Sequence, residues 1–404
     1  MRLIFLLVGC AHGYQTTHLP HRAPQRASTP QCLDVVVPSV AKKAREEGLR
    51  KVPRGEKDER PEYMKSKCNM YPRKVDVMNQ IEGFVQEQID AGLLLDQDKA
   101  WQPHDFLPDS EKPTEEWFDE VREFRKMAED LPDDLLLVLI GDMITEEALP
   151  TYLTLLNTLE GIDDPTGAVD TAFGRWSRQW TAEENRHGDL LNRYLYLSGR
   201  VNMRAIEETI MRLISSGFDP DTRCDPYRGF IYTSFQERAT KISHGNVGKL
   251  LGQAGDKWGS RICAKIAGDE ARHEKAYQSF VTQVLSIDPD GAIISYADMM
   301  KTQIVMPAEK MTDGKNPNLY NDFARVAQDL TVYTGVDYAS IMEHLNELWK
   351  IEHVTGLSPE AQEAQEFLAR LPARFRKLAE RQEKAFARTP REPREWSWLH
   401  GRVL

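Results

Sequence analysis

Two short stretches, EENRH at residues 183–187 and DEARH at residues 269–273, decide the fold of this chain. Each contains the pattern Glu-x-x-His. Residues three apart in an α-helix lie on one face about one turn apart, so the carboxylate and the imidazole can bind the same metal ion. One copy would carry little weight, but two copies predict two helices that present ligands to a common centre.

A lone glutamate accompanies each stretch on a similar apolar, helical background. Glu146 precedes the first stretch, and Glu237 lies between the two. A four-helix bundle that holds two iron or manganese ions takes one Glu from each of two helices and Glu-x-x-His from each of the other two. The order along the chain matches this arrangement and predicts six metal ligands: Glu146, Glu184, His187, Glu237, Glu270 and His273.

The donor set also restricts the metal. Four carboxylates and two imidazoles suit iron or manganese, whereas iron–sulfur clusters and many structural zinc sites use thiolates. The five cysteines are scattered and form no Cys-x-x-Cys pair, so we expect reduced thiols without a disulfide framework. A single Glu or His in a helix is more often hydrogen-bonded than bound to a metal. Two lone glutamates and two Glu-x-x-His stretches in the matching order, however, favour the dinuclear site.

Composition limits the size of the core and the kinds of partner. The chain has 404 residues, of which 41% are hydrophobic, so it can bury a large core. Its formal charge of −11 gives no electrostatic reason to expect nucleic acid or an anionic membrane as a partner. We therefore predict a protein with neither a nucleic-acid partner nor a membrane span.

The amino-terminal segment differs in kind from the rest. An apolar run at residues 3–8 resembles the core of a signal peptide, and residues 13–33 carry Arg22 and Arg26 but no acid, as transit peptides do. Together they predict a targeting segment over residues 1–40 and a location in the plastid stroma, such as that of a secondary plastid reached by a signal plus a transit sequence. A plain secretory signal or a disordered tail are the alternatives.

Helical periodicity, with glycine and proline at the joints, predicts an almost wholly α-helical chain. After an extended lead-in over residues 41–75, we expect a single domain over residues 76–404, in which further helices surround the bundle and the tail could form a short hairpin. Pro150 should bend a helix at Glu146, and Pro372 should split the last helix. The expected helices cover residues 76–93, 133–159, 170–197, 202–217, 227–244, 256–287, 291–304, 318–333, 337–351 and 359–387.

Three longer blocks resemble the soluble acyl-acyl carrier protein desaturases of plastids: GDMITEEALPTY at 141–152, WTAEENRHGDLL at 180–191 and GFIYTSFQERAT at 229–240. The resemblance extends from about Trp101 to the C-terminus. It implies a homodimeric, ferritin-like bundle with two iron ions per subunit. Such enzymes take electrons from ferredoxin and use O2 to introduce a cis double bond into a saturated acyl chain on acyl carrier protein, usually stearoyl at carbon 9.

Three further residues are candidates for catalytic roles under this resemblance. Thr240 lies one turn from Glu237 and could handle protons during the reaction, although bonding to a carbonyl of the preceding turn is an equally good account. Asp269 and Trp101 are expected to lie beside His187 and to carry electrons toward iron, because metal-bound histidines usually donate to a carboxylate.

A saturated acyl chain requires a long, narrow, apolar cavity. Candidates for its lining lie on the ligand-bearing helices, and for any one of them simple core packing is the alternative. Leu155 stands where Met is common in the resembled family, which leaves chain length and double-bond position open. The candidates are Leu155, Thr158, Leu159, Gly229 and Phe230.

Acyl carrier protein is acidic, and this chain is acidic too, so docking needs a local basic surface. We expect it at one end of the bundle, although most charge clusters are simply solvated. The residues concerned are Arg200, Arg204, Arg212, Arg223 and Arg228.

Two other functions share the ligand set. A ferritin-like iron-storage protein would need no acyl cavity and is usually much shorter. Another diiron oxygenase or a radical-generating subunit would need partner subunits or a redox tyrosine beside the iron. A membrane desaturase is excluded by the lack of spanning segments and His-rich boxes in the sequence.

Overall fold

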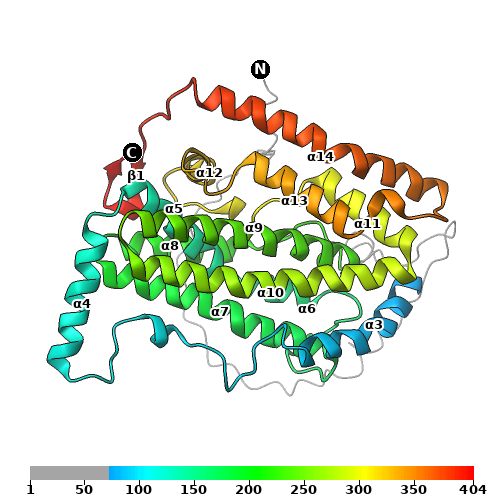
Figure 1. Ribbon diagram of the computed structural model, residues 1–404, viewed down its shortest axis with the longest axis horizontal. Helices are drawn as coiled ribbons and strands as arrows, with labels where there is room; N and C mark the ends of the chain where they lie inside the picture. The colour runs from blue at the N-terminus through cyan, green and yellow to red at the C-terminus, as the bar shows by residue number, and fades with distance from the viewer. Residues whose placement is uncertain (1–71) are drawn as a thin grey trace, which may run out of the picture.

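The computed structural model describes residues 72–404, and this part of the chain is almost entirely helical (Figure 1). The predicted targeting segment and nearly all of the predicted lead-in lie outside the described residues. None of the described helices has the length and apolar character needed to cross a membrane. The helices are α3 (Pro72–Asp90), α4 (Thr114–Glu129), α5 (Asp133–Glu147), α6 (Leu149–Asn157), α7 (Ala172–Ser198), α8 (Met203–Ser216), α9 (Pro226–Gln253), α10 (Lys257–Ile287), α11 (Pro289–Thr302), α12 (Leu319–Asp329), α13 (Gly335–Leu348) and α14 (Pro359–Phe386).

Four of these helices, α5, α7, α9 and α10, form the core that carries the predicted ligands. The long helices α9 and α10 pack along most of their length, and α5 lies against both α7 and α9. Figure 1 shows α9, α10 and α7 running side by side along the long axis, with α11, α13 and α14 on the other side of α9. The prediction of an all-α bundle with additional helices is confirmed.

The ends of the core helices follow from local capping. The Thr171 side chain accepts a hydrogen bond from the Gly174 amide at the start of α7, and Gly199 ends that helix with a left-handed φ of 65°. Asp256 caps α10 in the same way as Thr171 caps α7. These caps keep each Glu-x-x-His well inside a helix, where its two side chains share one face.

The predicted bend at Pro150 is present. Helix α5 ends at Glu147 and α6 begins at Leu149, because Pro150 has no amide hydrogen to continue the helical bonding. The Tyr152 hydroxyl donates to the Thr145 carbonyl at 2.7 Å, so the break is stabilised by a side chain. Pro132 occupies the N-cap position of α5 and makes no side-chain hydrogen bond, although Asp133 and Asp134 follow it in the first turn.

Helix α9 is longer than predicted. The glycines after His244 were interpreted as a break, but the helix continues to Gln253. A Cβ at Gly248 would lie 3.1 Å from the Cβ of Cys263 on α10, so this glycine serves the close approach of the two helices. Glycine therefore marks close packing here, not a turn.

Pro372 does not split the last helix, contrary to prediction. Helix α14 runs through it, although Pro372 cannot donate to the carbonyl of Leu368 one turn earlier. The Asn346 side chain on α13 donates to that carbonyl instead, at 2.9 Å. A side chain from a neighbouring helix thus replaces the missing bond.

Two features complete the fold. Helix α4 was not predicted; it lies against α7, and its Phe124 packs edge-on against Tyr194 with ring centroids 5.2 Å apart. The tail forms the expected short hairpin, in which β1 (Glu395–Trp396) pairs antiparallel with β2 (Arg402–Val403).

Candidate metal centre and cavity

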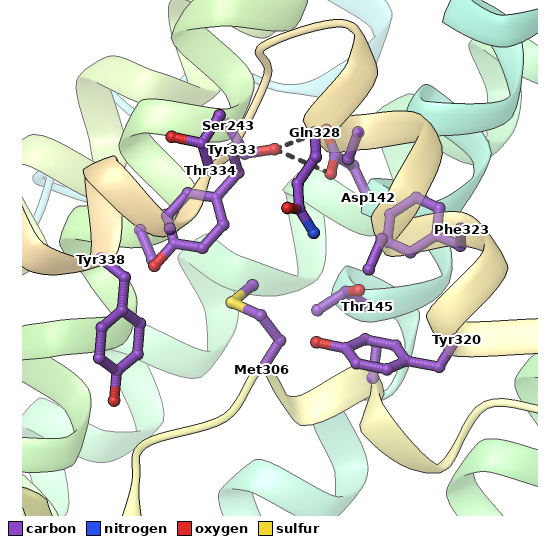
Figure 2. A pocket seen from close by; sticks show the side chains of 15 residues that line it. Asp142, Thr145, Ser243, Met306, Tyr320, Phe323, Gln328, Tyr333, Thr334 and Tyr338 are labelled. Atoms are coloured by element: carbon purple, nitrogen blue, oxygen red, sulfur yellow. Dashed lines mark hydrogen bonds between the residues drawn. The ribbon is translucent and has the colours of Figure 1, made fainter. Parts of the chain in front are cut away.

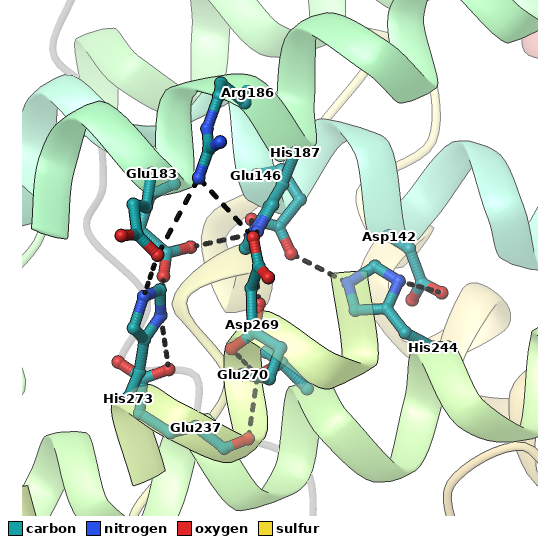
Figure 3. A network of polar contacts seen from close by, with 12 residues as sticks. Asp142, Glu146, Glu183, Arg186, His187, Glu237, His244, Asp269, Glu270 and His273 are labelled. Carbon is teal, nitrogen blue, oxygen red and sulfur yellow. Dashed lines mark hydrogen bonds and ion pairs between the residues drawn. The ribbon is translucent and has the colours of Figure 1, made fainter. Parts of the chain in front are cut away.

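All six predicted ligands are buried, and they converge on one point inside the core (Figure 3). Their ligand atoms form two overlapping groups, each with all its atoms within 4.8 Å of one another. Both groups contain Glu184 and Glu270, so these two carboxylates can bridge two ions. The first group is Glu146, Glu184, His187 and Glu270, and the second is Glu184, Glu237, Glu270 and His273.

Unpaired buried atoms test whether this cluster fits a pair of cations. Among the described residues, Nδ1 of His187, Nδ1 of His273, Oε1 of Glu184 and Oε1 of Glu270 are buried and make no hydrogen bond of good geometry. They crowd against one another instead, with Nδ1 of His273 lying 2.7 Å from Oε1 of Glu184 and Nδ1 of His187 lying 3.2 Å from Oε1 of Glu270. Leaving such atoms unpaired in a protein interior is costly. Metal ions bound between the four atoms would supply the missing partners, so the residues fit a dinuclear centre.

The nitrogen of each histidine that faces away from the centre, Nε2, already has a carboxylate partner. Nε2 of His187 lies 3.4 Å from Oδ2 of Asp269, and Nε2 of His273 lies 3.1 Å from Oε2 of Glu183. The first acid of each stretch therefore holds the histidine of the other stretch. Arg272 contacts both acids, which fixes the pair. With Nε2 bound outward, Nδ1 of each ring faces the centre, as metal ligation requires.

Electrostatics at the centre reflect crowded, buried acids. Burial raises the pKa of Glu146 to about 7 and raises that of Glu237 well above its usual range. Although burial opposes the shift, contact with His187 lowers the pKa of Asp269 to about 2. Acids this close to one another need nearby positive charge, which divalent ions would provide.

Trp101 lies where it was predicted, beside the centre. Its Nε1 donates to Oδ2 of Asp269 at 2.7 Å, and its ring is nearly parallel to that of His187, with an angle of 8° and centroids 6.1 Å apart. The guanidinium of Arg186 covers the indole at 4.4 Å. Trp101, Asp269 and His187 thus form a continuous path from the edge of the bundle to the ligands.

Thr240 makes two kinds of contact, and the carboxylate it meets is that of Glu270, not that of Glu237 on its own helix. Its hydroxyl oxygen lies 2.8 Å from Oε2 of Glu270 on the facing helix. The same hydroxyl lies 3.1 Å from the carbonyls of Gln236 and Glu237 in the preceding turn. It can therefore donate either to a bridging carboxylate or to its own helix.

A mainly apolar cavity borders the centre. Four of the six predicted ligands form part of its wall, and most of the rest is aliphatic or aromatic. The lining residues are Thr145, Glu146, Tyr152, Leu155, Leu156, Trp180, Glu184, Phe218, Tyr232, Thr233, Gln236, Glu237, Thr240, Glu270 and Pro307.

A second cavity adjoins the first (Figure 2). The two share Thr145, and the neighbours Met306 and Pro307 line one cavity each. Its wall is more hydroxylated, with Tyr320, Tyr333 and the Asp142 carboxylate facing inward (Figure 2). Together the two cavities offer space on both sides of Thr145.

Only one of the five predicted tunnel residues, Leu155, lines either cavity. Thr158 is exposed at the end of α6, where its hydroxyl donates to the Leu155 carbonyl. A Cβ on Gly229 would lie 2.6 Å from Leu159, so these two residues pack directly together and leave no gap. Phe230 is buried against Phe173. The predicted lining is therefore corrected to Leu155 alone, and the other buried residues are core.

Two residues that hold ligands were assigned no role from the sequence. Nε1 of Trp180 donates to Oε1 of Glu237 at 3.0 Å, and Nε2 of His244 lies 2.9 Å from Oε1 of Glu146. His244 lies two turns from Glu237 on the same helix, α9. Its partner lies on a different helix, however, and spacing along one chain segment gives no information about that contact.

Comparison with known proteins agrees with this geometry. The family model described as "Fatty acid desaturase" matches residues 73–400. A stearoyl-[acyl-carrier-protein] 9-desaturase from Brassica napus is 52% identical over 337 residues, covering 83% of each chain. The corresponding chloroplastic enzyme 5 from Arabidopsis thaliana is 52% identical over 342 residues, covering 85% of each. The Olea europaea enzyme is 53% identical over 337 residues, covering 83% of this chain and 85% of its own.

A solved structure also matches. It is the X-ray structure of a protein assigned as an acyl-ACP desaturase, DesA2 from Mycobacterium tuberculosis H37Rv, with 20% identity and a TM-score of 0.44 over 72% of this chain and 99% of that one. The family model and the plant relatives each extend over most of the described residues. By both measures, the chain belongs to the fatty acid desaturase family.

Proposed function

We propose that the protein is an acyl-[acyl-carrier-protein] desaturase, an oxidoreductase that introduces a cis double bond into a saturated acyl chain during unsaturated fatty acid synthesis. One observation carries the proposal: Glu146, Glu184, Glu237 and Glu270 are at once metal-ligand candidates and part of the wall of an apolar cavity. A chain lying in that cavity would touch the metal centre directly. An iron-storage protein has no use for such a cavity.

The proposed cofactor is a pair of iron ions held by the six predicted ligands. Bound iron supplies the oxidising power, with O2, that removal of hydrogen from an unactivated methylene needs. The protein's own contribution is to hold the chain beside the carboxylates, exclude water with the apolar wall, and orient each histidine through Asp269 or Glu183. Thr240 holds a proton within reach of Glu270.

The proposed electron donor is ferredoxin, which would dock near Trp101. Cationic side chains surround this tryptophan: Arg186 covers it, Lys265 lies 5.9 Å from its ring centroid, and Arg261 covers the neighbouring Phe106. Arg186 is buried, so the basic surface consists of the exposed Arg261 and the partly exposed Lys265, and such a surface favours an acidic partner and speeds its approach. Trp101 and Asp269 then lead inward to His187.

Stearoyl carrier protein, with the bond formed at carbon 9, is the proposed substrate, because the relatives bear that name. The two adjoining cavities would together accept the acyl chain on both sides of Thr145, with the first cavity beside the metal centre. Leu155 remains the proposed contact for the chain itself.

The predicted docking arginines for acyl carrier protein divide into two sets. Arg200 donates to main-chain carbonyls at the end of α4 and pairs with Asp133 at 3.0 Å, and Arg228 pairs with Asp298 at 2.6 Å. Both therefore serve the fold. Arg204, Arg212 and Arg223 are exposed and remain the candidates for docking.

A plastid location and a homodimeric state complete the proposal. The plant relatives are named as chloroplastic. The presequence that would direct the chain there lies outside the described residues, and its two-part character is retained as a prediction.

The proposal is tested by incubating the purified protein with reduced ferredoxin, O2, and either stearoyl or palmitoyl carrier protein. Mass spectrometry of the released fatty acids should reveal a monounsaturated product, with stearoyl preferred and the bond at carbon 9. If iron is taken up and oxidised but neither acyl chain is changed, the protein is not a desaturase and the storage function gains support.

A further inference from the structure

The two outer carboxylates of the metal centre are held by different kinds of group. Glu237 accepts from the indole of Trp180, which can donate one neutral hydrogen bond. Glu146 instead meets the imidazole of His244, with 2.9 Å between Nε2 and Oε1. The two halves of the centre therefore differ, although their ligand sets match.

A second carboxylate faces His244 from behind. The histidine is 1% exposed on α9, and its Nδ1, which makes no hydrogen bond, lies 3.9 Å from Oδ2 of Asp142, within the range of an ion pair. Asp142 accepts a hydrogen bond of 3.0 Å from the hydroxyl of Ser243. Asp142 and Glu146 lie one turn apart on α5, so the imidazole spans two carboxylates of one helix (Figure 3).

This group also lies between the metal centre and the second cavity. Asp142 and Ser243 line that cavity, whereas Glu146 lines the first (Figure 2). The bend after Glu147 makes such support useful, because α5 ends one residue beyond Glu146 and its last turn lacks the regular bonds of a helix interior. A carboxylate in the last turn of a helix benefits from a partner that keeps it in one orientation.

We propose that His244 is the positioning residue for Glu146, that Asp142 in turn fixes the His244 ring, and that this pair sets the affinity of the Glu146/His187 half of the centre. The inference rests on the metal centre proposed above. Trp180 has the corresponding task for Glu237 in the other half. Outer partners of metal ligands commonly change metal affinity by about 10- to 100-fold when removed.

The test measures metal binding to apo protein, independently of catalysis, by titration with Co(II) followed by absorption spectroscopy. Wild-type protein should bind two ions. His244→Leu should weaken one of them by about 10- to 100-fold, His244→Gln should recover most of the loss because its amide can donate to Glu146, and Asp142→Asn should give a smaller loss than His244→Leu. Circular dichroism and the Tm of each apo variant verify that it folds.

Two single-site backgrounds identify the affected half. In His273→Ala protein, which keeps the Glu146/His187 half, adding His244→Leu should weaken the remaining ion. In His187→Ala protein, which keeps the other half, the same addition should have no effect, whereas adding Trp180→Phe should weaken binding. Equal losses in both backgrounds, or no loss in either, would overturn the proposal for His244. A wild-type protein that fails to bind two ions would instead refute the metal centre itself.

Discussion

Adjacent acids in each Glu-x-x-His stretch have separate tasks. Glu184 and Glu270 face the centre, whereas Glu183 and Asp269 hold the histidines from outside. Each outer acid serves the histidine of the opposite stretch, so the two helices α7 and α10 orient each other's ligands. Arg272 joins the two outer acids and ties the halves together.

Thr240 permits a residue-scale prediction. Thr240→Val removes the hydroxyl that donates to Glu270, so kcat should fall by roughly tenfold while the iron content stays at that of the wild type. Thr240→Ser keeps a hydroxyl and should restore most of the rate. The measurements are steady-state kinetics and metal analysis of the three proteins. Full activity in Thr240→Val would mean that the hydroxyl serves only the carbonyls of its own helix.

At this scale, sequence spacing predicted the ligands but not all of their partners. The six ligands follow from the spacing of Glu-x-x-His and the two lone glutamates, because ligands on one face of a helix recur at fixed intervals. The Trp180–Glu237 and His244–Glu146 contacts join different helices. Such contacts depend on how the helices are rotated against each other, which no spacing within one segment encodes.

Helices α9 and α10 permit a prediction at the scale of the element. A Cβ at Gly245 meets nothing within 4 Å, whereas one at Gly248 meets Cys263 and the carbonyl of Ser260. Gly245→Ala should therefore raise the free energy of unfolding of the apo protein by about 0.5–1 kcal/mol through helix propensity. Gly248→Ala should lower it by about 1 kcal/mol, because α10 must move away.

Urea denaturation followed by circular dichroism measures both variants, and each serves as the control for the other. If the two substitutions stabilise the protein equally, then α9 and α10 do not approach as closely at Gly248 as the structure indicates.

Helix boundaries were predictable where a side chain caps the helix, as at Asn202, and not where tertiary packing decides. Gly248 and Pro372 were both interpreted as interruptions. The first instead allows close packing, and the second is tolerated because Asn346 bonds the carbonyl it leaves free. In each case the contact that explains the residue comes from another helix, so local helix propensity gave the wrong prediction.

On the scale of the whole molecule, electrons and substrate have different proposed routes to the centre. The proposed electron path runs from Trp101 through Asp269 to the outer side of His187. Both cavities, in contrast, adjoin the bend between α5 and α6. Separate routes allow a protein donor and a carrier-bound substrate to be bound together. The sequence predicted the all-α class and the central bundle, but the course of the cavity depends on packing and was predicted poorly.

The ferredoxin surface gives a prediction at this scale. Arg261→Glu reverses a charge beside Phe106 and Trp101, so the KM for ferredoxin should rise by roughly three- to tenfold at low ionic strength and less in salt. The KM for acyl carrier protein should stay unchanged. Lys275→Glu, at an exposed site farther along α10, is the matched control. Equal effects of the two reversals would place ferredoxin elsewhere.

The central claim is that the metal centre acts on an acyl chain lying in the adjacent cavity, and a single turnover tests it most directly. Two ferrous ions would supply two electrons, which with O2, two protons from solvent and the two hydrogens removed from the chain yield one double bond and two waters. Iron-loaded, reduced protein with bound stearoyl carrier protein is exposed to O2, and the fatty acid is analysed by mass spectrometry. The account predicts up to one carbon-9 double bond per two irons oxidised; complete oxidation of the iron with an unchanged stearoyl chain would contradict it.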